Sequence, residues 1–559
     1  MAYRILLMSS AANGVTQRAA LALRRAGREV AVEVVSNADD MDAAVARHDF
    51  DAIICPYLVS KIPARITHRW PTVIIHPGVV GDRGPSSLDY ARTEREKLWG
   101  TTAMMAVEEM DAGPVVATNT YAMPEDTKSA IYNTVGADAA IACILQTADR
   151  LQDRNFTPVP QDEHPRILAH ARTRPAIRQN QRAIDWTKAA KDILPGIHAA
   201  DGSPGALTTL AGHSVHIYDA HLSAVTAPGA LPGTIIGSTH HYLQIACGSG
   251  SLLIGHLRAR DETVPPVKAP AVDVLKRLGV SDIPAVDVDP GWTDIRYHRD
   301  GDAVGTVEFF AYNGAFSVDF SLRLAAAIRH AAAQPTRVLV IRGTGPYFSN
   351  GLHLGSIELA QNPDAEGWAS INAINRVCAE IAECEQVTIA AVQGSAGAGG
   401  VMLALTADFV VAAERCVLNP HYKLMGLTGS ELHTANLPRR VGRAKAEELL
   451  ATAEPIDTYG ALEIGLIDEI RPNRSFPQSV HRFARLYTGD QLYRAALYNK
   501  EERRRTTKKP VEVILAEETS RMHNCFFQDA LGHREKRQAF IRKALTPAQV
   551  SANHMPLAG

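Results

Sequence analysis

Two short regions of the chain carry side chains and turns that can act on a carbonyl carbon. In the first, the apolar residues 73–75 lead directly into His76-Pro-Gly, and Asp111-Ala-Gly113-Pro114 follows further along. A histidine at a strand end can stabilise an oxyanion or move a proton when a carboxylate such as Asp111 orients it. The glycine after Asp111 lets the backbone approach a ligand closely. The order of these motifs predicts a carbonyl-transfer site, although a lone loop histidine is more often structural.

The second region contains two glycine-rich turns, Gly351-Leu352 and Gly399-Gly400. Such turns can direct two backbone N–H groups at one oxygen, which stabilises the oxyanion or enolate of a thioester. Tyr422 and Glu431 follow, and a phenol with a carboxylate facing a thioester could move a proton between carbon and sulfur. Each could also be structural, since tyrosine packs in cores and Glu431 could cap a helix.

The elements that position His76 alternate strand candidates with helical spacing. This alternation predicts a parallel, doubly wound α/β sheet with functional residues at the carboxyl ends of its strands, where His76 falls. The strand candidates are residues 3–8, 29–35, 52–55 and 71–75.

The whole chain is expected to be an α/β multidomain protein, because 559 residues are too many for one core. Short strands with glycine turns predict a small β-barrel subdomain, and a proline-rich stretch predicts a linker. The expected divisions are an α/β domain at 1–175, the β-barrel at 176–260, the linker at 261–290, a second α/β domain at 291–490 and a charged helical tail at 491–559.

Composition limits the function classes. A net charge of −2 without long single-sign runs gives no sign of a nucleic-acid partner. No apolar run approaches the length of a membrane span. Seven cysteines lack ligand spacing and fit a reducing cytoplasm, so no metal site is expected. The basic stretch 500–509 favours a solvated helix face over a phosphate-binding role.

Residues 1–260 resemble the folate-dependent formyltransferase family. The resemblance implies 10-formyltetrahydrofolate as a co-substrate, His76 and Asp111 as catalytic residues, and Ser86, Gly113 and Pro114 at the folate site. It rests on His76-Pro, Asp111-x-Gly-Pro, Ile184-Asp-Trp186, Pro204-Gly-Ala206 and Pro232-Gly-Thr234.

One position departs from the formyltransferase pattern. The family's catalytic asparagine falls on Ile74, which can neither hold the formyl oxygen nor relay a proton. Either the site is inactive, or its acceptor needs less activation than an amine. A thiol is such an acceptor, because a thiolate fraction already exists near neutral pH.

Residues 295–490 resemble the enoyl-CoA hydratase/isomerase (crotonase) family, which implies an α/β spiral fold. By that resemblance the N–H groups of Leu352 and Gly399 polarise a thioester carbonyl, with Gly351 beside the coenzyme A. The two glutamates that handle water in hydratases fall on Met402 and His421, so hydration of a double bond is not expected. The match extends through residues 403–408, 437–442 and 461–468.

The two halves together, with the signature at 76–89, resemble the HoxX hydrogenase-maturation family over nearly the whole chain. The resemblance implies that coenzyme A accepts the formyl group and that formyl-CoA then loses carbon monoxide, the CO ligand of [NiFe]-hydrogenase. Tyr422 and Glu431 would be the acid–base pair, and an internal passage would join the sites. Hydrogenase maturation proteins are then candidate partners, besides small-molecule substrates.

Other readings remain open. Arg534, Arg537 and Arg542 of the tail are candidates for coenzyme A contacts, although such charges are often plain surface. The chain could instead formylate a small amine, with the crotonase half acting on another acyl-CoA. It could also be a non-catalytic scaffold with two eroded sites.

Overall fold

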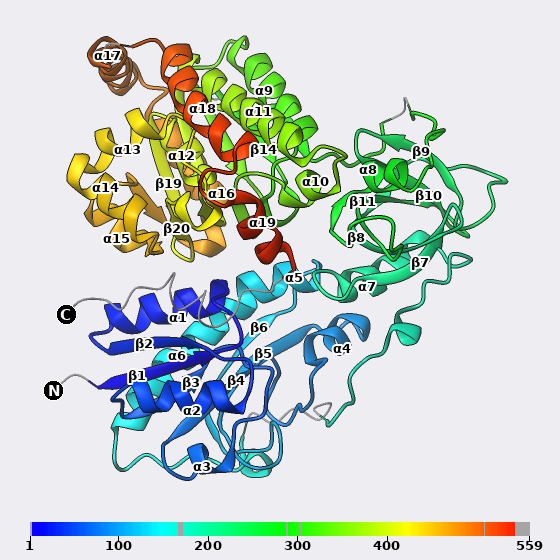
Figure 1. The fold of residues 1–559 in the computed structure, drawn as a ribbon, viewed down its shortest axis with the longest axis vertical. Helices are drawn as coiled ribbons and strands as arrows, with labels where there is room; N and C mark the ends of the chain where they lie inside the picture. The colour runs from blue at the N-terminus through cyan, green and yellow to red at the C-terminus, as the bar shows by residue number, and fades with distance from the viewer. Residues whose placement is uncertain (1–2, 166–171, 287–288, 302, 508, 543–559) are drawn as a thin grey trace. The chain divides into compact units, whose positions relative to one another are not determined.

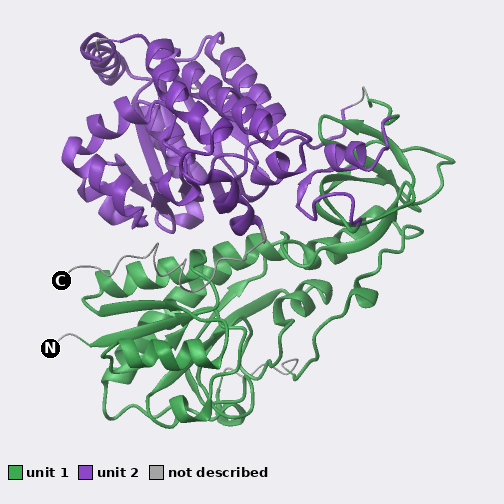
Figure 2. Cartoon of the chain, in the orientation of Figure 1, with its two compact units in different colours: residues 1–260, 282–286, 545–559 green, residues 261–281, 287–544 purple. Residues whose placement is uncertain are grey.

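The structure of the protein is a computed structural model. Its described residues form two compact units, green and purple in Figure 2. Unit 1 consists of residues 3–260 and 282–286, and unit 2 of residues 261–281 and 289–542. The stretch expected as a linker is therefore divided between the units, and it contains the helix α8 (Ala271–Arg277). The structure describes residues 3–165, 172–286, 289–301, 303–507 and 509–542.

Unit 1 begins with a six-stranded sheet. In sheet order its strands are β2 (Glu29–Val34), β1 (Arg4–Ser9), β3 (Ala52–Cys55), β4 (Thr72–His76), β5 (Leu98–Met105) and β6 (Val115–Ala122). The first four pair in parallel, as predicted. β5 and β6 extend the sheet in the antiparallel direction, which the sequence pattern did not indicate.

Helices cover both faces of this sheet (Figure 1). They include α1 (Gly14–Arg25), α2 (Ala38–Arg47), α3 (Ala64–Thr67) and α6 (Ala137–Gln152). Neighbouring residues of β1 enter different cores: Leu6 lies in a cluster with α2 and α3, and Leu7 in one with α1 and α6. This alternation confirms the doubly wound arrangement, because side chains of a strand point alternately to its two faces.

The second part of unit 1 is a small antiparallel β-sheet with α7 (Ala190–Ala200) beside it (Figure 1). Its main strands pair with their neighbours in the antiparallel direction. In pairing order they are β7 (Ala206–Leu210), β8 (His213–Ser223), β11 (Ser251–Ala259), β10 (Tyr242–Ala246) and β9 (Ile235–Thr239).

Unit 2 has the crotonase-type spiral, with one large and one small sheet. The large sheet runs β13 (Ile295–Arg299), β14 (Val304–Phe309), β15 (Val338–Gly343), β17 (Val387–Val392), β19 (Phe409–Ala413) and β22 (Glu469–Arg471). The small sheet runs β16 (Tyr347–Ser349), β18 (Ser395–Gly397), β20 (Val417–Asn419) and β21 (Ile456–Asp457). Most strand pairs in both sheets are parallel. Because β16 and β18 are parallel neighbours, the turns that follow them lie at the same end of the small sheet.

Helices complete unit 2 (Figure 1). α9 (Val318–Ala332) and α11 (Pro363–Glu383) bury apolar residues in the main core, and α12 (Gly399–Leu405) is buried throughout. The tail forms α17 (Asp490–Thr506), α18 (Val511–Phe527) and α19 (His533–Arg542). Residues of α17 and α18 are part of the same hydrophobic cluster, so these tail helices belong to the folded core of the unit.

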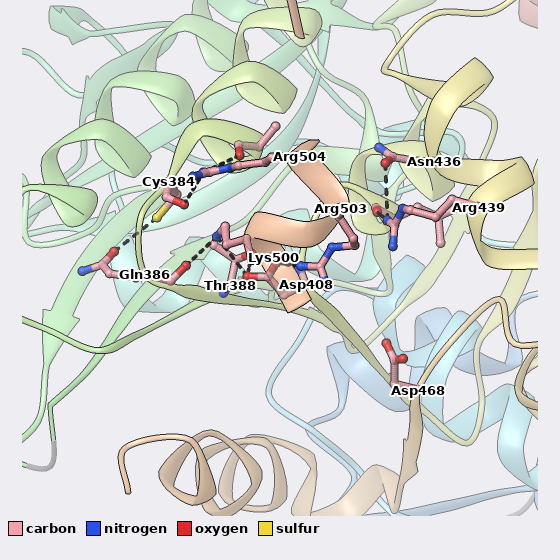
Figure 3. Close-up of polar contacts among 12 residues, drawn as sticks. Cys384, Gln386, Thr388, Asp408, Asn436, Arg439, Asp468, Lys500, Arg503 and Arg504 are labelled. Carbon is pink, nitrogen blue, oxygen red and sulfur yellow. Dashed lines mark hydrogen bonds and ion pairs between the residues drawn. The ribbon is translucent and has the colours of Figure 1, made fainter. Parts of the chain in front are cut away.

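The basic stretch that begins at Lys500 is exposed over most of its length, as expected, including Arg504, Arg505 and Lys509, but Lys500 and Arg503 are exceptions. Lys500 is 5% exposed, and its ammonium donates to Asp408 Oδ2 at 3.0 Å and to the Gln386 carbonyl at 2.6 Å (Figure 3). Arg503 pairs with the same carboxylate, which also accepts from Thr388. These side chains fix α17 to the sheet because a buried charge requires a partner. Lys500 and Arg503 are therefore structural contacts.

Among the helices of the described residues, none has the length and apolar character needed to cross a membrane. All seven cysteines are buried and none forms a disulfide.

Candidate active sites

The first site lies at the end of β4, where His76 is 5% exposed between two carboxylates. Its Nε2 is 3.2 Å from Asp82 Oδ2, and its Nδ1 is 3.6 Å from Asp111 Oδ2. The structure thus brings together the predicted pair, His76 and Asp111, and adds Asp82. Two carboxylates beside one imidazole fix its orientation. This arrangement suits proton transfer to or from a substrate.

Backbone features hold both carboxylates in place. A Cβ at Gly78 would lie 2.4 Å from His76 Nε2 and 2.7 Å from Asp82 Oδ2, so only glycine leaves room for this pair. Asp111 has a positive φ of 56°, and its Oδ2 accepts the Gly84 N–H at 3.1 Å. A non-glycine residue in this region is strained, and such strain is concentrated at functional sites.

The predicted folate-contact residues border this turn. A Cβ at Gly113 would lie 1.8 Å from the Met105 carbonyl oxygen, so the backbone there packs tightly, with Pro114 following. The Gln161 amide donates to the carbonyls of Asp111 and Gly113, at 2.9 Å in both cases. Sequence reasoning did not identify Gln161 or Asp82. The sequence could have indicated Asp82, which is a carboxylate six residues after the histidine, whereas no sequence pattern indicates Gln161.

Two other predicted positions of unit 1 have structural partners. Ser86 is buried, and its hydroxyl accepts the Ile177 N–H at 3.1 Å. Ile74 lies on β4 and packs against the apolar cluster of Leu6 and Phe50, so it brings no polar group to His76. The site therefore has no side-chain amide at position 74, as the isoleucine there in the sequence implies.

The second site lies in unit 2, where the two glycine-rich turns meet. A Cβ at Gly351 would lie 3.7 Å from the Gly399 nitrogen. Gly399 opens α12, whose first N–H groups have no partner within the helix. Within the described part of the chain, the N–H groups of Leu352 and Gly399 donate to no recorded protein acceptor. Two such donors on neighbouring turns are suited to polarising one carbonyl oxygen.

Tyr422 and Glu431 meet beside these donors. The Tyr422 hydroxyl is 2.9 Å from Glu431 Oε2 and 3.0 Å from the Ser430 carbonyl, and both side chains are almost fully buried. A Cβ at Gly399 would lie 2.1 Å from Glu431 Oε1, so the carboxylate occupies the space left by this glycine. The structure therefore places the predicted proton-transfer pair against a predicted carbonyl-binding amide.

Burial sets the protonation of this pair. Desolvation raises the pKa of Glu431 to about 7, with a further contribution from the nearby Glu518. Burial and the Glu431 carboxylate raise the pKa of Tyr422 well above its usual value. A carboxyl that titrates near neutral pH next to a neutral phenol can both accept and return a proton, the property that general acid–base catalysis requires.

The turn carrying Glu431 is held by the tail. Glu431 and Leu432 have φ of 59° and 60°, and the Glu431 N–H donates to Asn375 Oδ1 at 3.0 Å. Glu518 of α18, which is fully buried, accepts the N–H groups of Leu432 at 2.9 Å and Thr434 at 2.8 Å. Sequence reasoning found neither Asn375 nor Glu518, because each lies on another helix and no pattern links it to Glu431.

The positions of the hydratase glutamates have no carboxylate. Met402 is fully buried in the hydrophobic core. His421 is partly buried, and desolvation lowers the pKa of its imidazole to about 4, so it is neutral at pH 7. An apolar side chain and a neutral imidazole do not supply the paired carboxylates that activate water in a hydratase.

The predicted coenzyme A arginines have other partners. Arg537 is 2% exposed, and its Nε donates to Glu358 at 2.5 Å. Arg534 pairs with Asp364 at 2.6 Å. Arg542 ends α19, and its side chain lies outside the described residues. Arg537 and Arg534 thus attach α19 to the unit.

Two family models match the chain. The enoyl-CoA hydratase/isomerase model covers residues 310–545, and the model of the formyl transferase C-terminal domain covers residues 176–269. Methionyl-tRNA formyltransferase of Myxococcus xanthus is 27% identical over 183 residues, which make up 33% of this chain and 56% of that protein.

Two proteins match along almost their full length. The hydrogenase maturation factor HoxX of Bradyrhizobium diazoefficiens is 34% identical over 99% of this chain and 97% of its own. The crystal structure of HypX from Aquifex aeolicus in complex with tetrahydrofolic acid is 31% identical, with a TM-score of 0.92 and coverage of 100% of each chain.

Proposed function

Since this chain belongs to the family of the HoxX hydrogenase maturation factors, we propose that it makes carbon monoxide for a hydrogenase in two coupled steps. In the first, the formyl group of 10-formyltetrahydrofolate passes to coenzyme A. In the second, formyl-CoA loses CO. The formyltransferase and crotonase domains supply the two kinds of site that these steps require.

The first step belongs to His76. The coenzyme A thiolate attacks the formyl carbon, the C–N bond breaks, and the folate nitrogen takes a proton. An imidazolium oriented by Asp82 and Asp111 can stabilise the oxyanion and give that proton. Because a thiolate is already a strong nucleophile, the transfer has less need of the amide that Ile74 replaces.

The second step belongs to the Tyr422–Glu431 pair. Ionised Glu431 takes the proton from the formyl carbon, the C–S bond breaks, and Tyr422 gives its proton to the sulfur. Formyl-CoA becomes CO and coenzyme A, and Glu431 returns its proton to Tyr422 through their hydrogen bond. The N–H groups of Leu352 and Gly399 would hold the carbonyl oxygen.

The observation that carries this proposal is the 2.9 Å hydrogen bond between Tyr422 and Glu431, buried against Gly399. Formyl-CoA has no α-carbon, so the proton to be removed is on the carbonyl carbon and a proton acceptor is required there. The glutamates that activate water in hydratases are not needed for this step. The seven reduced cysteines favour the cytoplasm as the site of action, with hydrogenase maturation proteins as partners.

The test is CO output, followed by deoxyhaemoglobin absorbance, from the full chain with 10-formyltetrahydrofolate and coenzyme A. We expect CO to require both substrates and to fall by about 10²–10⁴-fold in Tyr422→Phe. Release of tetrahydrofolate in that variant, without CO, would assign the loss to the second step. CO at the wild-type rate from Tyr422→Phe would contradict the proposed mechanism, and formylation of an amine without CO would contradict the function.

A further inference from the structure

The small β-sheet of unit 1 contains a strained aspartate that neither carbonyl site uses. Asp219 lies within β8 with a φ of 56°, whereas its neighbours Tyr218 and Ala220 keep their pairing with β11. The Asp219 N–H turns out of the ladder and donates to Asp201 Oδ2 at 2.9 Å. A non-glycine residue with positive φ is strained and persists where its surroundings require it.

The space for the Asp219 carboxylate is made by a glycine. A Cβ at Gly255 of β11 would lie 2.1 Å from Asp219 Oδ2. Asp219 is 1% exposed. Its carboxylate is therefore enclosed within the unit, and a buried carboxylate requires polar or charged partners.

Histidines surround this carboxylate. His256 Nδ1 is 2.9 Å from Asp219 Oδ2, and His221 Nε2 is 2.8 Å from Oδ1. The antiparallel register of Leu243 with Ile254, continued by two residues, places His241 opposite His256, and their ring centroids are 5.7 Å apart. Cross-strand neighbours of this kind share one face of a sheet. One ligand atom each from Asp219, His241 and His256 lies within 4.8 Å of the others.

From this geometry we propose that Asp219, His241 and His256 bind a divalent transition-metal ion of the Zn²⁺ type. Two imidazoles and a carboxylate are an ordinary ligand set for Zn²⁺, with ligand bonds of about 2.0–2.2 Å. Three protein ligands leave one position for water. His221, bonded to the other carboxylate oxygen, orients the ligand, as partners behind metal-binding groups commonly do. Sequence analysis expected no metal site, because these three residues form no recognisable ligand spacing.

Without a metal ion, the same side chains would form a buried His–Asp–His group joined by hydrogen bonds. A measurement of metal binding therefore distinguishes a metal site from such a hydrogen-bonded group. The experiment uses the full chain without an affinity tag, treated with a chelator and dialysed. It is titrated with Zn²⁺ against a chromophoric chelator, and in parallel with Co²⁺ to record visible d–d absorption. The variants are Asp219→Asn and His241→Asn. The matched control is His240→Asn, since His240 adjoins His241, is exposed, and has a φ of 52° that asparagine tolerates.

We expect one equivalent of Zn²⁺ per chain in the wild type and in His240→Asn, and affinity at least about tenfold weaker in His241→Asn and Asp219→Asn. Zn²⁺ should also raise the Tm of the wild type but not that of His241→Asn. If Asp219→Asn fails to fold, the partly exposed His241 still tests the site. A wild type that binds no added Zn²⁺ in the titration, or His241→Asn with undiminished affinity, would overturn the proposal, and neither outcome depends on formyl transfer.

Discussion

The two carbonyl sites differ in how the chain assembles them. In unit 1, His76 ends β4, and both carboxylates beside it, Asp82 and Asp111, come from loops within the next 35 residues of the same sheet region. In unit 2, Glu431 depends on groups from separate helices, among them Asn375, Gly399 and Glu518. The first site is therefore local in sequence, and the second exists only when the tail helix α18 is in place.

The sites also differ in electrostatics. His76 has two acidic neighbours, whose carboxylate oxygens lie 3.2 and 3.6 Å from its ring nitrogens. Glu431 has a second buried acid, Glu518, near it, and its pKa is raised to about 7. At the first site, two carboxylates place negative charge next to the ring of His76. At the second site, burial keeps the pKa of the Glu431 carboxyl close to neutral pH. Variants of each site should therefore impair one step and spare the other.

The largest effect is expected from Gly399→Ala, which would break the second site alone. The new Cβ would lie 2.1 Å from Glu431 Oε1 and must displace the carboxylate. CO release from supplied formyl-CoA should fall by about 10³-fold, because both proton transfer and the carbonyl contact are disturbed. Gly397→Ala is the control, since its Cβ would meet only Asn350 Oδ1, at 3.3 Å. Equal losses in the two variants would count against the assigned geometry.

Asp82→Asn should affect the first site next most strongly. Asparagine keeps the shape of the side chain but removes the charge beside His76 Nε2. Tetrahydrofolate release should slow by about 10²-fold, while CO release from supplied formyl-CoA stays unchanged. Asp111→Asn sharpens the assignment, because Asp111 lies further from the ring and also accepts the Gly84 N–H. A larger loss in Asp111→Asn would make Asp111 the principal partner of His76.

This contrast explains what could be predicted from the sequence. The β-branched strands before His76 and the motif order after it predicted both the sheet and the position of the first site. The antiparallel β5 and β6 were missed, since threonine, glycine and alanine interrupt their apolar pattern. Glu518 was missed for a different reason: in sequence it is one charged residue on a charged helix, and only packing buries it.

Glu518→Gln should have a moderate effect and tests the dependence on the tail. The amide can still accept one N–H of the Glu431 turn, but it loses the charge that faces His433 and Glu431. CO release should fall by about tenfold, and its pH profile should shift to lower pH, because removing Glu518 removes a charge that raises the pKa of Glu431. Glu517→Gln is the control, since Glu517 pairs with Lys509 at the surface. A slower rate with an unmoved profile would mean that Glu518 acts only on folding.

The smallest effect is the pH dependence of the wild type. If ionised Glu431 takes the formyl proton, CO release should rise with pH, reach half its plateau near pH 7, and fall about tenfold per unit below it. The folded pKa lies above the ordinary value of 4.5, so Glu431 favours folding at low pH and loses that contribution as pH rises through 7. Glu431→Gln should therefore gain stability relative to the wild type at pH 8 but not at pH 4. CO release that did not change between about pH 5 and pH 9 would rule out Glu431 as the group that takes the formyl proton.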